Sequence, residues 1–506
     1  MGSLYTGAFR NLSVHRELRD LNEVRSATMQ SKITAFFVVC ALSNAVVAGA
    51  ATATEPDSTT TATMNQIRDA AMSSQWAWQR LEELTDRIGP RLSGSPQNAA
   101  AVAQVAAAMR ALGAEVHLQP VKVPHWVRGE ERAELTDYPG KPDGITQTLH
   151  LTALGGSSAT AATGLTARVI VVHNFDELKA HATEVRGNIV LFEAKFDQRL
   201  ADNGQAGPAY GQAGAYRFAG PSAAAALGAT AALVRSIGGA DYRLPHTGAT
   251  RWADKQAAIP AAALTAEDAD LVTRLAAQGP VVMKLLLTPK TLPDADAANV
   301  IADWPGTELP NEYVVVSGHL DSWDLATGAT DDGVGLMAAA GVIQVLKQLN
   351  VHARRTIRFI GWANEENGGR GHEAYFDSVK QSIGSQVGAI ESDIGAGRSL
   401  GVLAGVTLDS MSALQPVSRA LAPIGATALE RRDDELGSDI EPLEHEGVAG
   451  FAPLVDTRHY FDYHHTAADT LDKVDPQNLN SQVATMAVLA YYLAQLPEAL
   501  PGVKTP

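Results

Sequence analysis

The sequence predicts an α/β fold with a mostly parallel central sheet, helices on both faces and an inserted, β-rich second domain. After residue 299, short apolar runs alternate with stretches of helical length and pattern. The run 313–317 is rich in valine and continuous, which is typical of a parallel strand buried on both faces. Between residues 151 and 290 the composition shifts to alanine and glycine with short strands, and this shift predicts the insertion.

The 506 residues are enough for two or three domains. We expect an upstream extension and signal peptide in residues 1–53, the first part of the α/β domain in 54–150, the insertion in 151–290, and the second part of the α/β domain in 291–506. The first part begins with a Thr-rich stretch, residues 54–63, that we expect to be disordered. The last part alternates predicted strands and helices: 313–317, 334–349, 356–363, 370–379, 387–390, 400–404, 412–421, 451–454 and 477–496.

The composition is that of a globular protein, with 45% hydrophobic and 19% charged residues. A formal charge of −16 argues against nucleic acid or an anionic membrane as a partner. The single cysteine, Cys40, lies in the apolar run 33–47, which follows Lys32 and precedes small residues. This layout is typical of a secretory signal, with Met29 as a plausible start. A membrane anchor is the alternative, but the run is shorter than the roughly 20 residues of a span. We therefore expect export to the periplasm or exterior, with no membrane contact after cleavage.

Five groups of acidic and histidine residues follow predicted strands in the last region. They are His319 with Asp321, Asp331 with Asp332, Glu365 with Glu366, Ser392 with Asp393, and His464 with His465 and Asp469. Such side chains repel one another in a common cleft unless a cation lies among them. Imidazole and carboxylate groups suit Zn²⁺. Their number exceeds what one open zinc site needs and suits two metals that share a carboxylate.

Five segments carry a resemblance to a known family: GHLDSWD, GATDDGVG, WANEENGGRG, ESDIGAG and YHHTAADT. In this order they resemble the metal-binding motifs of the M28 family of di-zinc peptidases. The earlier IGPRLSGS and VPHWVRGEERAEL resemble its carboxypeptidase Q branch, and the insertion resembles a protease-associated domain. The resemblance implies an exopeptidase that hydrolyses dipeptides or short peptides with free termini, and it suggests a homodimer.

The resemblance also implies site roles. His319 and Asp393 would bind one Zn²⁺, Glu366 and His465 the other, and Asp331 would bridge both. The resemblance further implies a cis peptide bond between Asp331 and Asp332.

Glu365 would be the general base that activates a bridging water, and Asp321 would orient His319 from outside the ligand set. Neighbours on an extended strand point in opposite directions, so Glu365 and Glu366 can divide these tasks at a strand end.

Several alternatives stay open. His464 is a candidate donor to the oxyanion, with Tyr460 and Tyr463 as substitutes, and His464 and His465 exchange roles if the register slips by one.

The motifs do not say whether the enzyme recognises an amine, through acidic groups such as Glu365 or Asp393, or a carboxylate, through Arg370 or the insertion. An aminopeptidase is therefore the first alternative. A non-catalytic metal-binding relative is the second, although every expected ligand and Glu365 are present. From the insertion, side chains that could reach the site are Tyr210, Tyr216, Arg217, Tyr242 and His246.

Overall fold

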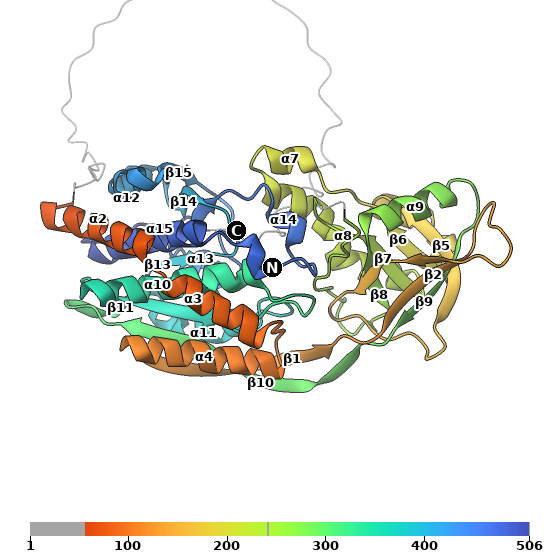
Figure 1. Cartoon of the computed structure of the whole chain (residues 1–506), viewed down its shortest axis with the longest axis horizontal. Helices are drawn as coiled ribbons and strands as arrows, with labels where there is room; N and C mark the ends of the chain where they lie inside the picture. The colour runs from red at the N-terminus through yellow and green to blue at the C-terminus, as the bar shows by residue number, and fades with distance from the viewer. Residues whose placement is uncertain (1–55, 240–241, 505–506) are drawn as a thin grey trace, which may run out of the picture.

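Two eight-stranded sheets, each flanked by helices, lie side by side along the long axis of the molecule (Figure 1). The computed structural model describes residues 56–239 and 242–504. The predicted signal sequence and Cys40 lie outside the described residues, so their prediction stays untested. The α/β architecture with helices on both sheet faces is as the sequence predicts.

The central sheet has the strand order β1-β10-β12-β11-β13-β16-β14-β15. Its four middle strands, from β12 to β16, pair in parallel, whereas β1, β10 and β14 join through antiparallel ladders. The strands are β1 (Glu115–Val127), β10 (Lys290–Trp304), β11 (Leu309–His319), β12 (Arg355–Trp362), β13 (Gln386–Glu391), β14 (Ser399–Gly405), β15 (Ala428–Arg431) and β16 (Gly450–Val455). The carboxyl ends of the middle strands therefore meet at one edge of the sheet.

Helices cover both faces of the central sheet because its middle strands are apolar on both sides. Val314 and Val316 of β11 belong to the core formed with α10 and α15, whereas Val315 packs with residues of α11 and α13. The helices of this region are α2 (Ser58–Ser73), α3 (Trp76–Glu83), α4 (Pro96–Leu112), α10 (Val334–Leu349), α11 (Arg370–Val379), α12 (Gln415–Leu421), α13 (Glu441–His445), α14 (Tyr460–Tyr463) and α15 (Pro476–Gln495). The bounds of α10 and α11 are those that the sequence predicts.

Two local expectations differ from the structure. The Thr-rich stretch is not disordered where it is described, because α2 begins at Ser58 with Asp57 as its N-cap, accepting a hydrogen bond from the Thr60 amide at 2.6 Å. The buried Met64 and Ile67 join the core that α15 also lines, and this packing stabilises the helix. The long strand β10 was not predicted from the sequence, because its first half is exposed and shows no apolar pattern.

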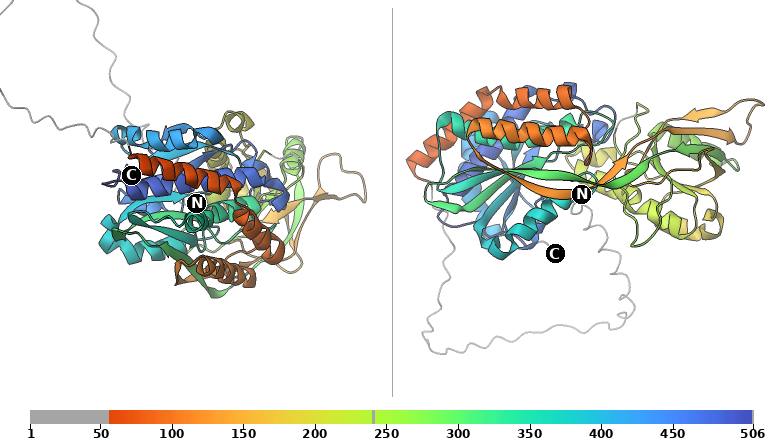
Figure 2. Two further views of the ribbon diagram at one scale, coloured as in Figure 1. Left: turned by 60° about the vertical axis from the view of Figure 1, so that its left-hand side comes forward. Right: turned by 90° about the horizontal axis from the view of Figure 1, so that it is seen from below.

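The second sheet has the order β3-β2-β9-β5-β6-β7-β8-β4. Its strands are β2 (Glu131–Asp137), β3 (Gln147–Leu149), β4 (Leu151–Ala153), β5 (Leu165–Val172), β6 (Ile189–Phe192), β7 (Ala231–Arg235), β8 (Ala261–Leu264) and β9 (Val282–Leu287). Its helices are α5 (Phe175–Ala180), α6 (Ala182–Val185), α7 (Gln198–Asp202), α8 (Ala206–Ala226) and α9 (Ala266–Ala276). Strands β2 and β3 precede the expected boundary at residue 151. The chain enters and leaves through the paired strands β1 and β10 (Figure 2), so we propose that this sheet is the inserted domain.

The two sheets are joined beside the loop that follows β11. Trp323 lies in the core of the second sheet, with its ring centroid 6.5 Å from that of Trp126. A side chain at Gly155 would lie 2.2 Å from the Trp323 ring, so only glycine allows this approach. Arg128 donates three hydrogen bonds to the carboxylate of Asp324, at 2.7, 2.9 and 3.1 Å. These contacts hold the loop after β11 against the second sheet.

Candidate metal centre

The predicted site residues come together at the carboxyl edge of the parallel strands. His319 is the last residue of β11, and Glu365 and Glu366 follow β12. Asp393 follows β13, and His465 lies in the loop after α14. Asp331 and Asp332 come from the turn Ala329–Gly333 that precedes α10. The parallel topology explains why His319, Glu366 and Asp393 converge, because they lie at or just after strands that end at the same edge.

One group of candidate ligand atoms surrounds the imidazole of His319, which is fully buried. Its Nε2 atom lies 3.2 Å from Oδ1 of Asp331 and 3.5 Å from Oδ1 of Asp393. Burial opposes a charge on this ring, but the carboxylates of Asp393 and Asp331 raise its pKa well above the ordinary value. We call His319, Asp331 and Asp393 the His319 group.

A second group surrounds the imidazole of His465. Its Nε2 atom lies 3.1 Å from Oδ2 of Asp331 and 3.1 Å from Oε2 of Glu366. Asp331 therefore turns one oxygen to each group. All three atoms of this second set are buried, and none has a hydrogen-bond partner within the described part of the chain. We call Asp331, Glu366 and His465 the His465 group.

The donor set fits bound metal. Three buried polar atoms that face one another without a hydrogen bond are costly unless a cation binds them. Burial raises the pKa of Glu366 well above its ordinary value, and the charge of Asp331 adds to the shift. Burial likewise raises the pKa of Asp393 to about 6. Nitrogen and oxygen ligands without sulfur suit Zn²⁺, and a carboxylate with one oxygen in each group suits a pair of ions.

Glu365 and Glu366 point to different partners, as neighbours at a strand end should. The Ser438 hydroxyl donates a hydrogen bond of 2.8 Å to Oε1 of Glu365, whereas the amide of Trp323 donates to Oε1 of Glu366 at 3.1 Å. Asn364, just before them, has a positive φ of 67°, which turns the chain out of the strand. Glu366 therefore faces His465, and Glu365 is held separately by the segment that contains Ser438.

Buried carboxylates outside the two groups hold the backbone of the site. The carboxylate of Asp321 accepts hydrogen bonds from the amides of Glu365 and Glu366, at 3.1 and 3.3 Å. It is the backbone oxygen of Asp321, 2.9 Å from Nδ1 of His319, that orients this imidazole, because the carboxylate lies 4.0 Å away. The expected contact thus involves the main chain instead of the side chain.

Asp332 and Asp469 fix the turn that presents Asp331. The Asp332 carboxylate accepts from the amide of His319 at 2.9 Å and from that of Gly335 at 3.0 Å. The Asp469 carboxylate accepts from the Thr330 amide at 2.7 Å and the Asp331 amide at 3.2 Å. The Asp331–Asp332 peptide bond is cis, as the resemblance predicts.

The second sheet contributes to the site through the segment around His246. Thr247 exchanges two hydrogen bonds with His465: its amide donates to the His465 oxygen at 2.9 Å, and its oxygen lies 3.2 Å from Nδ1 of the imidazole. His246 Nε2 lies 3.2 Å from Nδ1 of His464. Arg217 is fully buried and bonds Tyr210 and the Thr247 oxygen. Of the candidates from the insertion, Tyr210, Arg217 and His246 therefore reach the site.

The other two candidates from the insertion do not reach it. Tyr216 packs on Phe175 with ring centroids 4.9 Å apart, in the core below α8. Tyr242 is 82% exposed. The contacts of Ser438 and Thr247 with the site were not predicted from the sequence. A serine in a polar loop and a backbone oxygen belong to no recognisable motif. For His246 and Arg217, only the residue type indicated that the side chain could contribute to the site.

The fold and the donor set together define a metal-dependent hydrolase. Residues 299–490 match the model of peptidase family M28. Carboxypeptidase Q from Bos taurus is 35% identical over 427 residues, which cover 84% of this chain and 86% of that protein. The crystal structure of a peptidase M28 precursor from Shewanella amazonensis superposes with a TM-score of 0.82 and 34% identity, covering 88% of this chain and 99% of that chain.

A more distant relative is Aminopeptidase YwaD from Bacillus subtilis, 24% identical over 318 residues that cover 63% of this chain and 60% of that protein. The chain belongs to peptidase family M28. It is a metallo-exopeptidase with peptide substrates. Within the described residues, no helix is both long and apolar enough to cross a bilayer.

Proposed function

We propose that the chain is a di-zinc exopeptidase of the carboxypeptidase Q type that hydrolyses dipeptides and short peptides with free termini. The observation that carries this proposal is the set of three buried, unpartnered atoms in the His465 group, next to the complete His319 group. Similarity to carboxypeptidase Q over most of both chains supports the substrate class. Bound in these two groups, the zinc ions would polarise the scissile carbonyl and lower the pKa of water.

The ligands that we propose are His319 and Asp393 for one zinc, Glu366 and His465 for the other, and Asp331 for both. The distances from the two imidazoles to the two oxygens of Asp331, 3.2 and 3.1 Å, support the bridging role. The positions of the two adjacent histidines support His465 as the ligand, since its Nε2 faces two carboxylates. His464 Nε2 lies 3.1 Å from Asp331 alone.

Glu365 is the general base in this proposal. It takes a proton from the attacking water while the new carbon–oxygen bond forms, and it delivers that proton to the leaving nitrogen as the carbon–nitrogen bond breaks. The hydrogen bond from Ser438 and the hydrogen bond from the Glu365 amide to Asp321 support this role, because the first holds the Glu365 carboxylate and the second holds its backbone. His464 donates to the oxyanion, with Tyr460 as the substitute donor packed against its ring at 4.8 Å.

An aminopeptidase of the same family is the second candidate, favoured by the number of acidic groups in the site and by the more distant relative. Both are tested by one panel: free dipeptides, N-acetylated dipeptides and C-amidated dipeptides, each with and without a chelator. Hydrolysis of the acetylated set indicates recognition of the carboxylate, and hydrolysis of the amidated set indicates recognition of the amine. If the zinc-loaded protein hydrolyses none of the three sets, the proposal is wrong.

We also propose that the protein is exported, and that two copies associate. The basis for export is the signal-like stretch around Cys40, and the basis for the dimer is the family resemblance. N-terminal sequencing of protein purified from the periplasm or the medium tests cleavage after the small residues 48–53. Sedimentation velocity of the mature protein tests association.

A further inference from the structure

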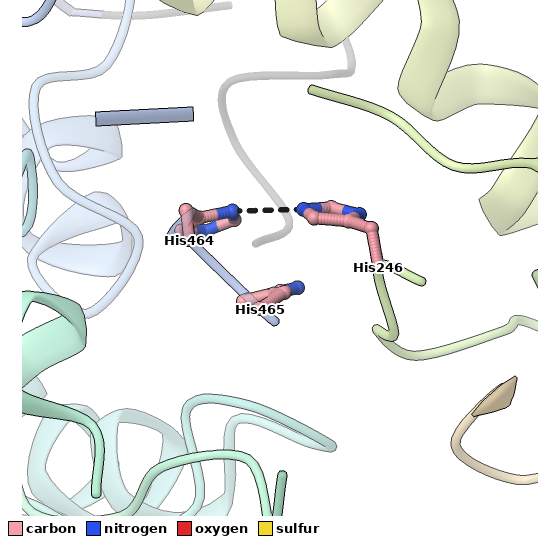
Figure 3. Close-up of side chains that lie close together, drawn as sticks. All are labelled: His246, His464 and His465. Atoms are coloured by element: carbon pink, nitrogen blue, oxygen red, sulfur yellow. Dashed lines mark hydrogen bonds between the residues drawn. The ribbon is translucent and has the colours of Figure 1, made fainter. Parts of the chain in front are cut away.

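The segment around His246 is the point at which the second sheet touches the histidine pair after α14. Figure 3 shows His246 opposite His464, with His465 beside them. The rings of His464 and His465 are stacked, with centroids 3.7 Å apart and an interplanar angle of 16°. Two consecutive residues of the loop between β7 and β8 thus meet consecutive histidines: His246 meets His464, and Thr247 meets His465.

The hydrogen bonds of His246 define where its proton lies. Only 2% of the residue is exposed, and its Nδ1 is buried without a hydrogen-bond partner in the described residues. A buried N–H without an acceptor is rare in proteins, so the hydrogen lies on Nε2. The same accounting excludes a doubly protonated ring, since that form also carries a hydrogen on Nδ1. Nε2 of His246 is therefore the donor in the 3.2 Å contact with Nδ1 of His464.

This donor fixes the proton of His464 in turn. A neutral imidazole has one donor and one acceptor nitrogen, so a ring that accepts at Nδ1 carries its hydrogen on Nε2. That Nε2 atom lies 3.1 Å from Oδ2 of Asp331, the oxygen that also faces His465. The N–H of His464 therefore lies beside the His465 group, and Oδ2 of Asp331 takes no hydrogen bond from it within the described residues. In the proposed function, the carbonyl of a bound peptide is its acceptor.

His465 has the opposite tautomer. Its Nδ1 lies 3.2 Å from the oxygen of Thr247, which can only accept, so the hydrogen lies on Nδ1 and the Nε2 lone pair faces the carboxylates. Arg217 Nη1 lies 3.4 Å from the same Nδ1, but its hydrogens also have Tyr210 and the Thr247 oxygen as acceptors. The stacked imidazoles of His464 and His465 thus place an N–H group and a nitrogen lone pair, respectively, near Oδ2 of Asp331.

We propose that His246 is a positioning residue of the hydrolytic site, and that its Nε2–H holds His464 in the tautomer that donates to the oxyanion. The inference rests on the proposed function of His464. The region of the second sheet then acts on the reaction itself, because a side chain from the loop between β7 and β8 determines the tautomer of the donor His464.

The test compares His246→Gln with His246→Leu. The glutamine amide can donate in place of Nε2, whereas leucine fills the space without a donor. We expect His246→Leu to lower kcat by roughly 10- to 100-fold with KM nearly unchanged, in the range for residues that orient a ligand shell. His246→Gln should recover most of the loss. The matched control is His181→Leu, a half-exposed histidine at the surface of the same region.

A direct readout does not depend on turnover. In the metal-free protein with ¹⁵N-labelled histidine, the nitrogen shifts of His464, assigned through His464→Gln, should report a hydrogen on Nε2 in the wild type and in His246→Gln. In His246→Leu the hydrogen should move at least partly to Nδ1. A wild-type His464 protonated on Nδ1, or equal loss of kcat in both variants, overturns the inference. The proposed function falls separately, if the wild type hydrolyses no member of the peptide panel.

Discussion

The two ligand groups differ in what holds them. His319 is held by nearby segments of the central-sheet region: the backbone oxygen of Asp321 faces Nδ1 of the imidazole, and the Asp332 carboxylate accepts from the His319 amide. The imidazole of His465 is held by Thr247, 218 residues earlier in the chain and on the side of the second sheet. One half of the site thus follows from the ends of the central strands, whereas the other needs the two sheets to be docked. Changes at the contact between Thr247 and His465 should therefore affect the imidazole of His465 more than that of His319.

The largest effect on metal content and turnover is expected at Asp331, which belongs to both ligand groups. Asp331→Asn removes the charge that both groups share, so we expect the purified protein to lose both metal ions. Turnover should fall by at least about 10³-fold, because metal ions contribute several kcal/mol to such reactions. Metal analysis after gel filtration is the measurement, with His465→Gln as the contrast and the exposed Asp377→Asn as the control. Retention of one tightly bound ion in Asp331→Asn would contradict the shared role.

The next largest effect is expected at a residue outside both groups. Glu365→Gln keeps the shape of the side chain and can still accept a hydrogen bond from Ser438, but it cannot take a proton. We expect kcat to fall by roughly 10²- to 10⁴-fold, with metal content as in the wild type. The exposed Glu373→Gln is the control. Loss of metal in Glu365→Gln would instead assign this residue to the ligand set.

A smaller and one-sided effect should follow from Gly248→Ala. Gly248 has φ +142°, which strains any other residue, and an added Cβ would lie 2.3 Å from Nη1 of Arg217, so the segment of Thr247 or the guanidinium beside it has to shift. We expect about 10- to 100-fold weaker binding of the ion at the His465 group, with little change for the ion at the His319 group. Competition with a fluorescent chelator measures both affinities. In the control, Gly207→Ala, the added methyl group of α8 meets open space. Equal weakening of both ions would argue against separate support for the two halves.

The smallest effect concerns the segment that carries Ser438. Burial raises the pKa of Glu444 to about 8, and the charges of Glu435 and Glu441 oppose its ionisation further. Between about pH 4.5 and 8 the folded chain binds a proton that the unfolded chain has lost, so this group makes stability fall as pH rises. Glu444→Gln should therefore raise Tm by a few degrees at pH 8 and hardly at pH 4.5.

Thermal unfolding at the two pH values measures this difference, with the exposed Glu446→Gln as the control. An equal gain in Tm at both pH values would show that ionisation of Glu444 is not its source. Both ligand groups should be unaffected in this variant, because Glu444 contacts the Leu436 amide and neither imidazole.

The sequence alone predicted the parallel centre of the fold and the residues that meet there. His319, Glu366 and Asp393 each follow an apolar strand, and parallel strands end at one edge, so order along the chain determines proximity. The bounds of α10 followed from its continuous apolar pattern. The long exposed half of β10 and the capped start of α2 were not predicted, because their polar residues carry no periodic pattern and pairing or packing decides their structure.

By itself, then, the sequence predicted the fold class and the five clusters of acidic and histidine residues, since these depend on local pattern and on the order of strands. The proposed ligands and the proposed base within those clusters came from the resemblance to the family. The tertiary structure decided which atoms hold them. That the Asp321 carboxylate binds the Glu365 and Glu366 amides, that Ser438 fixes Glu365, and that His246 and Thr247 meet His464 and His465 all depend on contacts between distant segments. The hydrogen bonds of Asp321 and Ser438 follow from the packing of loops around the central sheet, and those of His246 and Thr247 follow from the packing of the two sheets. No periodicity or spacing in the chain encodes them.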